Sequence, residues 1–434
     1  MRILILNQDW FKDEFLEAGH EAITCGMGEH LDVPIATPLM HIDSVIASLP
    51  NNFSPDVILW HDNSAPCMFT GLDETDTPCL FYSVDAQHHS DLHTNLAHVF
   101  DHTYVAQKDY IPLFERNKVR SIEWLPLWAP RYVEQSNEKK FNSIFVGSMN
   151  ARLNPDRVAF FDELKKHTDI VIEQGAYWNL FPFSEIVVNQ TVKSDLNFRV
   201  FEGMMCGSLM LTEATSNGLF ELFKDGEHIV TYERGNAQDA ASKINMLLND
   251  KSLCRKIAEN GRDEILNRHR PQHRAEVILN RLRSLQRTKN DQRFLGSMLN
   301  FGILSLPLEK KDTAICGKSL IAALRAAEQS LEFNEKPNEL QTFYFIVSAI
   351  RYDRILGSTA GTEMIHRFAE AHPENMAIGL TKVRALLNSG RVADAKAYAH
   401  QLAPIAPELV FKDAELLVAE FLKLVDNYNP SLFP

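Results

Sequence analysis

Three polar residues stand close together in the middle of the chain: Asn197, Arg199 and Glu202. They belong to the stretch Asn197–Cys206, whose apolar residues recur at helical spacing, and Gly207 follows where a helix would end. The start of a helix favours anions through its free N–H groups and its dipole. Because Arg suits phosphate and Glu suits ribose hydroxyls, these residues together predict a nucleotide-binding helix.

Strand-type runs flank this predicted helix. Glu185–Asn189 precedes it and Ser208–Leu211 follows it, so the segment reads as strand, loop, helix and strand. Its loop would lie at the carboxyl end of a parallel strand, where open α/β sheets bind ligands. The alternative is an ordinary buried unit without a ligand, in which the apolar residues are simply core. In that case Glu202 would need an internal partner, because a buried carboxylate without one is costly.

A second candidate lies where another predicted strand, Asn142–Val146, ends. Gly147 and Ser148 follow this strand directly, and Arg157 comes soon after. A glycine at a strand-to-helix turn lets backbone N–H groups approach a phosphate closely. The alternative is a tight turn with solvated arginines.

Polar clusters also follow the strands predicted in the first part of the chain. Asp85 and His88 come just after the strand Cys79–Ser83. Polar groups at strand ends line one shared cleft, where an Asp or a His can take a proton from an acceptor hydroxyl. One alternative is a capping or loop role for these side chains. Another is a metal site shared with Asp91 and the neighbouring histidines, but their spacing is not that of a helical zinc motif.

Two motifs in the second half and two in the first resemble one known family. The run N-x-R-x-F-E-x-M-x-C-G at Asn197–Gly207 is followed by G-L-x-E-L-F-x-x-G-E-H-I from Gly218. Earlier, D-x-x-H stands at Asp85–His88 and F-D-x-x-Y-V-A-Q-K-D-Y at Phe100–Tyr110. Over about residues 1–287 the chain is similar to the CgeB-like glycosyltransferases, which belong to the GT-B class.

The resemblance implies an α/β fold of two Rossmann-like, doubly wound domains, and a nucleoside diphosphate sugar as donor. It implies that Glu202 holds the ribose, while Asn197, Arg199, Arg157 and the loop of Gly147 and Ser148 serve the rest of the nucleotide. The acceptor would enter beside Asp85 and His88 as the catalytic residues. Neither a cofactor nor a metal is expected.

One position departs from the pattern of related retaining enzymes. Their motif of two glutamates, separated by seven residues, ends at the position of Glu202, but its first glutamate falls on Ser194 here, with Asp195 beside it. Retention and inversion of the sugar configuration therefore both stay open. Two other functions also stay open: a nucleotide-sugar epimerase or hydrolase, and a non-catalytic scaffold that acts through its helical region.

The order of predicted elements divides the chain into five parts. They are an acceptor-side domain (1–125), a linker (126–140), a donor-binding domain (141–268), a crossing helix (269–290) and an all-α region (291–434). Around Leu386–Tyr398 the last part resembles the turn of a tetratricopeptide-type helix pair. This region would bind an acceptor protein, mediate self-association, or cover an edge of the catalytic part.

Composition narrows the class of protein. The chain has 434 residues, enough for two or three domains, and its formal net charge of −13 argues against duplex nucleic acid or an anionic membrane as the main partner. Six cysteines without short paired spacing predict reduced thiols. The amino-terminal apolar run predicts a first strand rather than a signal peptide, and no apolar run reaches about 18 residues. We therefore expect a cytoplasmic protein without a membrane span.

Overall fold

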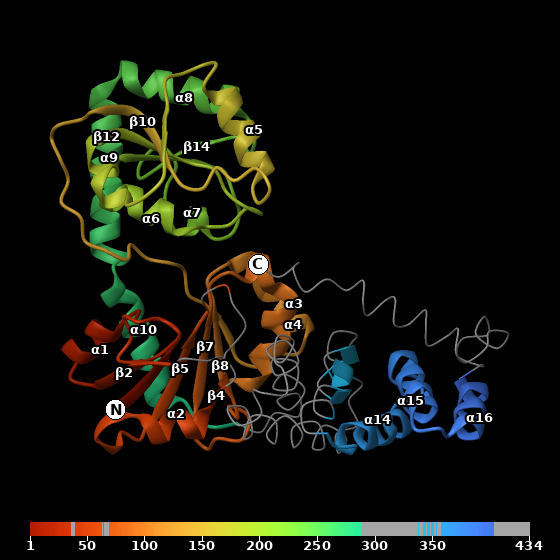
Figure 1. Cartoon of the computed structure of the whole chain (residues 1–434). Helices are drawn as coiled ribbons and strands as arrows, with labels where there is room; N and C mark the ends of the chain where they lie inside the picture. Colours follow the sequence, from red (N-terminus) through yellow and green to blue (C-terminus); the bar gives the residue numbers. More distant parts are fainter. Residues whose placement is uncertain are drawn as a thin grey trace.

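The structure of the chain, a computed structural model, describes residues 1–35, 40–62, 64, 69–288, 337, 342–343, 345–347, 349–350, 353 and 357–402. Two large parallel sheets lie within these residues. Figure 1 shows them as the centres of two lobes, the first formed by the start of the chain and the second by the part that follows residue 140. The predicted α/β alternation is confirmed for both lobes.

The first sheet has seven parallel strands in the order β3-β2-β1-β5-β7-β8-β9. They are β1 (Arg2–Leu6), β2 (Glu21–Gly26), β3 (Val33–Pro34), β5 (Val57–His61), β7 (Cys79–Ser83), β8 (His102–Val105) and β9 (Ile122–Trp124), and β4 (Met40–His41) pairs separately with β6 (Phe69–Thr70). The central strands β5 and β7 are buried at every residue, as expected for parallel strands between two helix layers.

Successive residues of these strands face opposite helix layers. Ile3 of β1 lies in the same apolar cluster as Phe15, whereas the next residue, Leu4, lies in the cluster of Ile42 and Val45. The helices of this lobe are α1 (Lys12–Glu17), α2 (Ile42–Ser48), α3 (Ala86–Leu96) and α4 (Ile111–Arg116).

The second sheet has five parallel strands in the order β11-β10-β12-β13-β14. They are β10 (Phe141–Val146), β11 (Val171–Glu173), β12 (Ser184–Asn189), β13 (Leu209–Glu213) and β14 (Val230–Tyr232). Its first helices are α5 (Pro155–Leu164), α6 (Phe198–Met205), α7 (Leu219–Leu222) and α8 (Ala237–Asn249). Helices α5 and α8 pack together on one face, and α6 packs on the other.

Two consecutive helices run from the second lobe to the first. Helix α9 (Lys251–Arg268) packs on α6 and β13, and α10 (Pro271–Ser284) packs on α1. Figure 1 shows α10 continuing from the lower end of α9 alongside the first lobe. The segment between the sheets follows the same route, since the N–H of Ala129 donates to the carbonyl of His269 at 2.8 Å. Two segments therefore connect the lobes: the segment between the two sheets, and the pair of helices α9 and α10.

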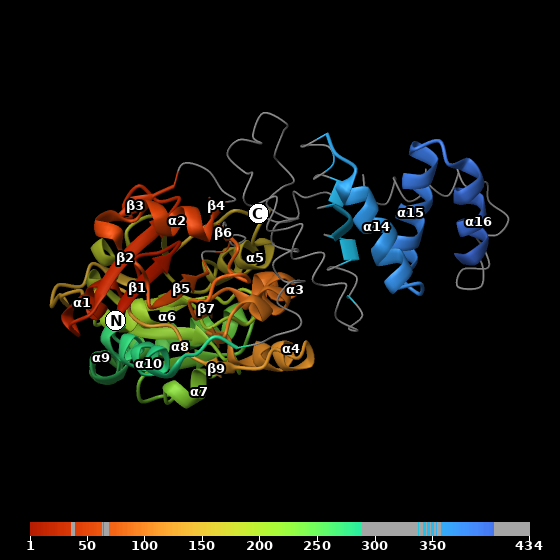
Figure 2. The same ribbon diagram turned by 90° about the horizontal axis from the view of Figure 1, so that it is seen from below.

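Three further helices are described near the end of the chain: α14 (Ala360–Ala371), α15 (Met376–Asn388) and α16 (Val392–Leu402). They pack in chain order, and Figure 2 shows them side by side. Gly390, with a φ of 74°, closes α15 at the predicted turn. Much of the predicted all-α region lies outside the described residues, as do two of the six cysteines. The other four are buried.

Candidate functional site

The carboxyl ends of the two sheets face each other. Because all strands of each sheet are parallel, the loops that follow them gather along one edge. The ring of Phe198, at the start of α6, lies 5.9 Å from that of Trp10, which follows β1, and 5.1 Å from that of Trp128 in the connecting segment. Trp10 in turn lies 5.3 Å from His61 at the end of β5. Residues from the carboxyl edges of the two sheets are therefore in contact with one another.

Arg199 on the first turn of α6 is directed at the end of β10. Its Nε donates to the carbonyl of Val146 at 3.0 Å, and its Nη1 donates to Oδ1 of Asn189 at 2.8 Å. A Cβ on Gly147 would lie 2.5 Å from Nη2, so a glycine makes room for the guanidinium at this turn. Nη2 itself makes no hydrogen bond within the described residues. Burial lowers the pKa of Arg199 to about 10, so the side chain still carries its charge at neutral pH.

Glu202 lies one turn further along α6 and is half-buried. Its carboxylate makes no hydrogen bond or ion pair with any residue that the structure describes. Burial raises the pKa of Glu202 to about 7, and the charge of Arg199 opposes this rise. Burial also raises the pKa of Tyr177, and the negative charge of Glu202 adds to that effect. The internal partner that a purely structural carboxylate would require is therefore absent from the described part of the chain.

Asn197 stands at the N-cap position of α6, but its side chain does not cap the helix. Its Nδ2 donates to Oδ1 of Asp195 at 3.3 Å, and its own Oδ1 is buried without a partner among the described residues. Asp195 also accepts the N–H of Val192 at 2.7 Å, and burial raises its pKa to about 6. Lys193 and Ser194 both adopt positive φ, of 52° and 62°, so this loop turns tightly before the helix.

Arg157 and Ser148 meet on the other side of the β10 loop. The Nε of Arg157 donates to Oε1 of Gln190 at 2.9 Å, its Nη2 to the Gln190 carbonyl at 3.3 Å, and its Nη1 to the Ser148 carbonyl at 3.4 Å. Arg157 is only 7% exposed. Each of its nitrogens is already engaged, so this guanidinium fixes the Ser148 loop to the end of β12.

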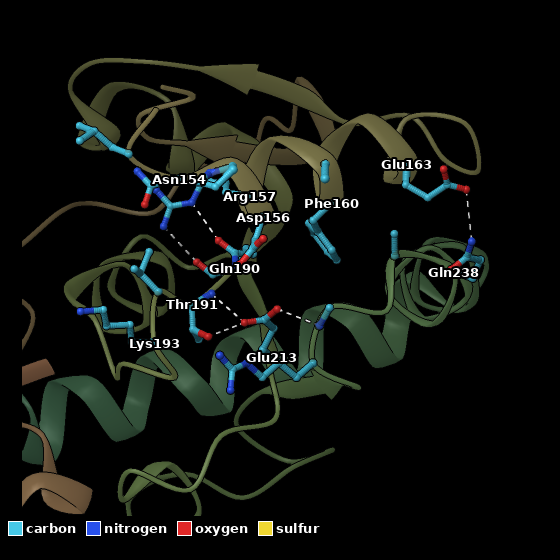
Figure 3. A pocket seen from close by; sticks show the side chains of 17 residues that line it. Asn154, Asp156, Arg157, Phe160, Glu163, Gln190, Thr191, Lys193, Glu213 and Gln238 are labelled. Atoms are coloured by element: carbon cyan, nitrogen blue, oxygen red, sulfur yellow. Dashed lines mark hydrogen bonds between the residues drawn. The ribbon is translucent and has the colours of Figure 1, made fainter. Parts of the chain in front are cut away.

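A cavity of about 700 Å³ opens beside Arg157, between α5 and the start of α8. Figure 3 shows Gln190, Thr191 and Glu213 on one wall and Gln238 on another. Glu213 accepts the N–H of Thr191 at 2.8 Å and that of Gly235 at 3.0 Å. The buried carboxylate in the wall of this cavity is therefore satisfied by groups of its own lobe.

In the first lobe, Asp85 precedes α3 and is held by two side chains. It accepts hydrogen bonds from Oγ of Ser64 and, at 3.0 Å, from Nε2 of Gln87. Its backbone N–H donates at 2.8 Å to Asp62, a buried carboxylate at the end of β5 that also accepts the N–H of Val84 at 3.1 Å. Burial raises the pKa of Asp62 to about 6, and the charge of Asp85 adds to this rise.

His88 is exposed, one turn into α3. The loss of hydrating water around its ring lowers the pKa of His88. The negative charge of Asp85 raises this pKa, and the positive charge of Lys193 lowers it. Since Lys193 belongs to the second lobe, His88 lies at the junction of the lobes. His93 is buried instead, 3.6 Å from Asp62, and burial lowers its pKa to about 3. Among the described residues no group of three His, Cys, Asp or Glu side chains could hold a metal ion.

Two parallel-sheet lobes with facing carboxyl edges are the architecture of the GT-B class of glycosyltransferases. Among solved structures, HepE from Anabaena, determined in complex with UDP-glucose, is 14% identical in sequence to this chain. The match covers 66% of this chain and 100% of the HepE chain, with a TM-score of 0.52. A glycosyltransferase from Rickettsia africae is also 14% identical in sequence. That match covers 65% of this chain and 97% of the Rickettsia chain, with a TM-score of 0.47. The likeness to HepE shows the shared fold.

Residues 133–280 match a family model described as glycosyl transferase-like. The match spans the second sheet and continues into α10. No curated protein sequence matches the chain. None of the helices in the described ranges is both long and apolar enough to cross a membrane.

Sequence reasoning assigned no role to three polar residues near these edges. Asp62 bonds within the first lobe, whereas Gln107 and Asn217 join the two lobes. Asp62 comes just after β5 and Gln107 just after β8, and a polar residue after a strand is the same signal that selected Asp85. Asn217 precedes Gly218, whose φ of 80° marks a tight turn. The importance of Gln107 and Asn217 lies in their contact with each other, which no local pattern indicates.

Proposed function

We propose that this chain transfers a sugar from a nucleoside diphosphate sugar to an acceptor in the cleft between the two lobes. The single observation that carries the proposal is Glu202, a half-buried carboxylate one turn from Arg199 that has no hydrogen-bond or ion-pair partner among the residues the structure describes. The glycosyltransferase-like match over residues 133–280 and the fold shared with HepE support it. Because the HepE structure contains UDP-glucose, UDP is the first nucleotide to test.

In this proposal each donor-side residue has a separate task. Glu202 accepts hydrogen bonds from the ribose hydroxyls, and Asn197 lies beside the same helix start. Nη2 of Arg199 and the backbone N–H groups near Gly147 and Ser148 bind the diphosphate. Fixed positive charge and N–H groups of this kind stabilise a leaving diphosphate without a divalent metal.

On the acceptor side, Asp85 takes the proton from the acceptor hydroxyl. The contacts from Ser64 and Gln87 hold its carboxylate in place, and exposed His88 lines the acceptor's path. The division into an acceptor-side domain (1–125), a hinge (126–140), a donor-binding domain (141–268) and a crossing helix (269–290) belongs to the same proposal. Closure about the hinge excludes water that would otherwise hydrolyse the donor.

The finer class is proposed on the motifs alone: a CgeB-like enzyme of the cytoplasm. Helices α14–α16 belong to a tetratricopeptide-like region that binds a protein partner or a second copy of the chain. Their consecutive packing and the tight turn at Gly390 support this assignment.

The test compares the wild-type chain with Glu202→Ala, using calorimetric titration with UDP and transfer assays with UDP-sugars. Glu202→Ala should abolish measurable UDP binding and leave the melting temperature close to that of wild type. Glu259→Ala, which removes an exposed carboxylate on α9, is the matched control and should bind UDP normally. Unchanged transfer by Glu202→Ala would remove the assignment. Products formed from donor alone would point to an epimerase or hydrolase.

A further inference from the structure

A set of buried hydrogen bonds joins the lobes away from the connecting segment. Gln107 follows β8 in the first lobe, and Leu196 and Asn217 belong to loops of the second lobe. All three are 1% exposed. Buried polar groups of this kind are costly to separate unless water can replace each bond.

The side-chain amide of Gln107 pairs with both backbone groups of Leu196. Its Oε1 accepts the Leu196 N–H at 3.0 Å, and its Nε2 donates to the Leu196 carbonyl at 3.4 Å. The same Nε2 donates to the carbonyl of Val84 at 3.5 Å, and Oε1 also accepts from Nδ2 of Asn217. The amide thus makes all the hydrogen bonds that its two donors and two lone pairs allow.

A reciprocal pair lies next to this amide. The N–H of Asp109 donates to Oδ1 of Asn217 at 3.0 Å, and the N–H of Asn217 donates to Oδ2 of Asp109 at 3.1 Å. Oδ2 of Asp109 also accepts from Oγ of Ser216. The end of β8 is therefore bonded to the loop after β13 as well as to the loop after β12.

Leu196 lies only two residues before α6. Its buried side chain belongs to the same apolar cluster as Val200 of that helix. Because Gln107 fixes its backbone, the first lobe sets the position at which α6 begins. Arg199 and Glu202 stand on the first two turns of this helix.

We propose that Gln107 is a positioning residue of the nucleotide site. By holding Leu196 it places the start of α6, so that Arg199 and Glu202 bind a nucleotide fully only when the lobes are closed. The inference rests on the proposed function, because it takes these two side chains as nucleotide ligands. Binding linkage is reciprocal, so a bound nucleoside diphosphate strengthens lobe closure in turn.

The test measures UDP binding by calorimetry in the full chain. Gln107→Leu keeps the size of the side chain and removes its hydrogen bonds, so the Kd for UDP should rise about tenfold. Lys108→Ala is the matched control: its neighbouring ion pair with Glu221 also bridges the lobes but is exposed, so UDP affinity should stay within about twofold. In a transfer assay, Gln107→Leu should raise the KM for donor more than it lowers kcat, a split that loss of folded protein cannot produce.

Gln107→Glu is the second variant in case Gln107→Leu fails to fold. It keeps the acceptor for the Leu196 N–H but sets an oxygen against the carbonyls of Leu196 and Val84. Hydrogen exchange in the wild-type chain adds a readout without mutation, since UDP should slow exchange at the Leu196 N–H.

The outcomes separate the two proposals. A wild-type chain that binds none of ADP, CDP, GDP and UDP overturns the proposed function and this inference with it. Wild-type binding of UDP with the same Kd in the Gln107 variants overturns this inference alone. So does UDP binding that leaves exchange at Leu196 unchanged.

Discussion

At Glu202 burial and charge act on one carboxyl in opposite directions. Burial raises its pKa to about 7, and the positive charge of Arg199 limits that rise. Near neutral pH the carboxyl is therefore divided between a form that only accepts hydrogen bonds and a form that carries a proton. Only the ionised form offers four lone pairs to ribose hydroxyls.

The proposed role of Glu202 predicts a dependence of nucleotide binding on pH. The raised pKa means that the carboxyl is mostly ionised at pH 8 and mostly protonated at pH 6, so affinity falls as pH falls through about 7. The Kd for UDP should rise about tenfold over this range. The side chain of Glu202→Gln cannot titrate, so any change of Kd with pH in this variant reports the titration of the UDP phosphates. Equal pH profiles for the two proteins in calorimetric titrations would contradict the role.

Helix α6 is held against its sheet and against α9 by close backbone approaches. A Cβ on Gly203 would meet the side chains of Met210 and Val187. On α9, a Cβ on Gly261 would lie 2.5 Å from the backbone carbonyl oxygen of His228 and 3.2 Å from the sulfur of Met204. A backbone oxygen cannot swing aside as a flexible side chain can, so α9 itself would have to move.

This packing predicts that Gly261→Ala destabilises the chain. Alanine gains roughly 1 kcal/mol of helix propensity, but overpacking costs about 1–3 kcal/mol, and the contact with the His228 carbonyl places this site toward the upper end. We expect a net loss of about 1–2 kcal/mol and a lower melting temperature by differential scanning calorimetry. Lys256→Ala on the exposed side of α9 is the control. A melting temperature at or above that of wild type would show that α9 can shift freely.

Arg274 on α10 connects the lobes through a buried guanidinium. Its Nε donates to the Pro126 carbonyl at 2.7 Å, and its Nη2 donates to the Leu127 carbonyl at 2.8 Å and lies 2.7 Å from Nδ1 of His269. Nη1 donates to the carbonyl of Arg268 at 3.0 Å. One side chain thereby ties the connecting segment to the turn between α9 and α10.

Removing this guanidinium should weaken the chain as a unit. Arg274→Ala leaves several buried acceptors unpaired, and we expect a loss of about 2–4 kcal/mol in the free energy of unfolding, measured by urea denaturation. Arg281→Ala on the same helix breaks a partly exposed ion pair with Glu123 and should cost no more than about 1 kcal/mol. Equal losses of unfolding free energy in the two variants would mean that the buried hydrogen bonds of Arg274 stabilise the chain no more than an exposed ion pair does.

Local pattern was enough to predict much of the second lobe. The apolar spacing of Asn197–Cys206 and the glycine that follows predict a helix, and the structure has α6 at Phe198–Met205 with Gly207 at a φ of 71°. Short apolar runs predict the parallel strands in the same way. These predictions succeed because the spacing of apolar residues and the conformational freedom of glycine act within a few residues.

What only the folded chain decides is which distant groups meet. Gln107 and Asn217 are 110 residues apart, yet their side chains bond to each other in the junction of the lobes. The sequence likewise selects Arg157 as a donor-side cation, but its position in space engages every nitrogen with Gln190 and Ser148. Residue type and spacing determine which chemistry is available. Whether a charged group is free or already paired depends on contacts that form only when the sheets and loops come together.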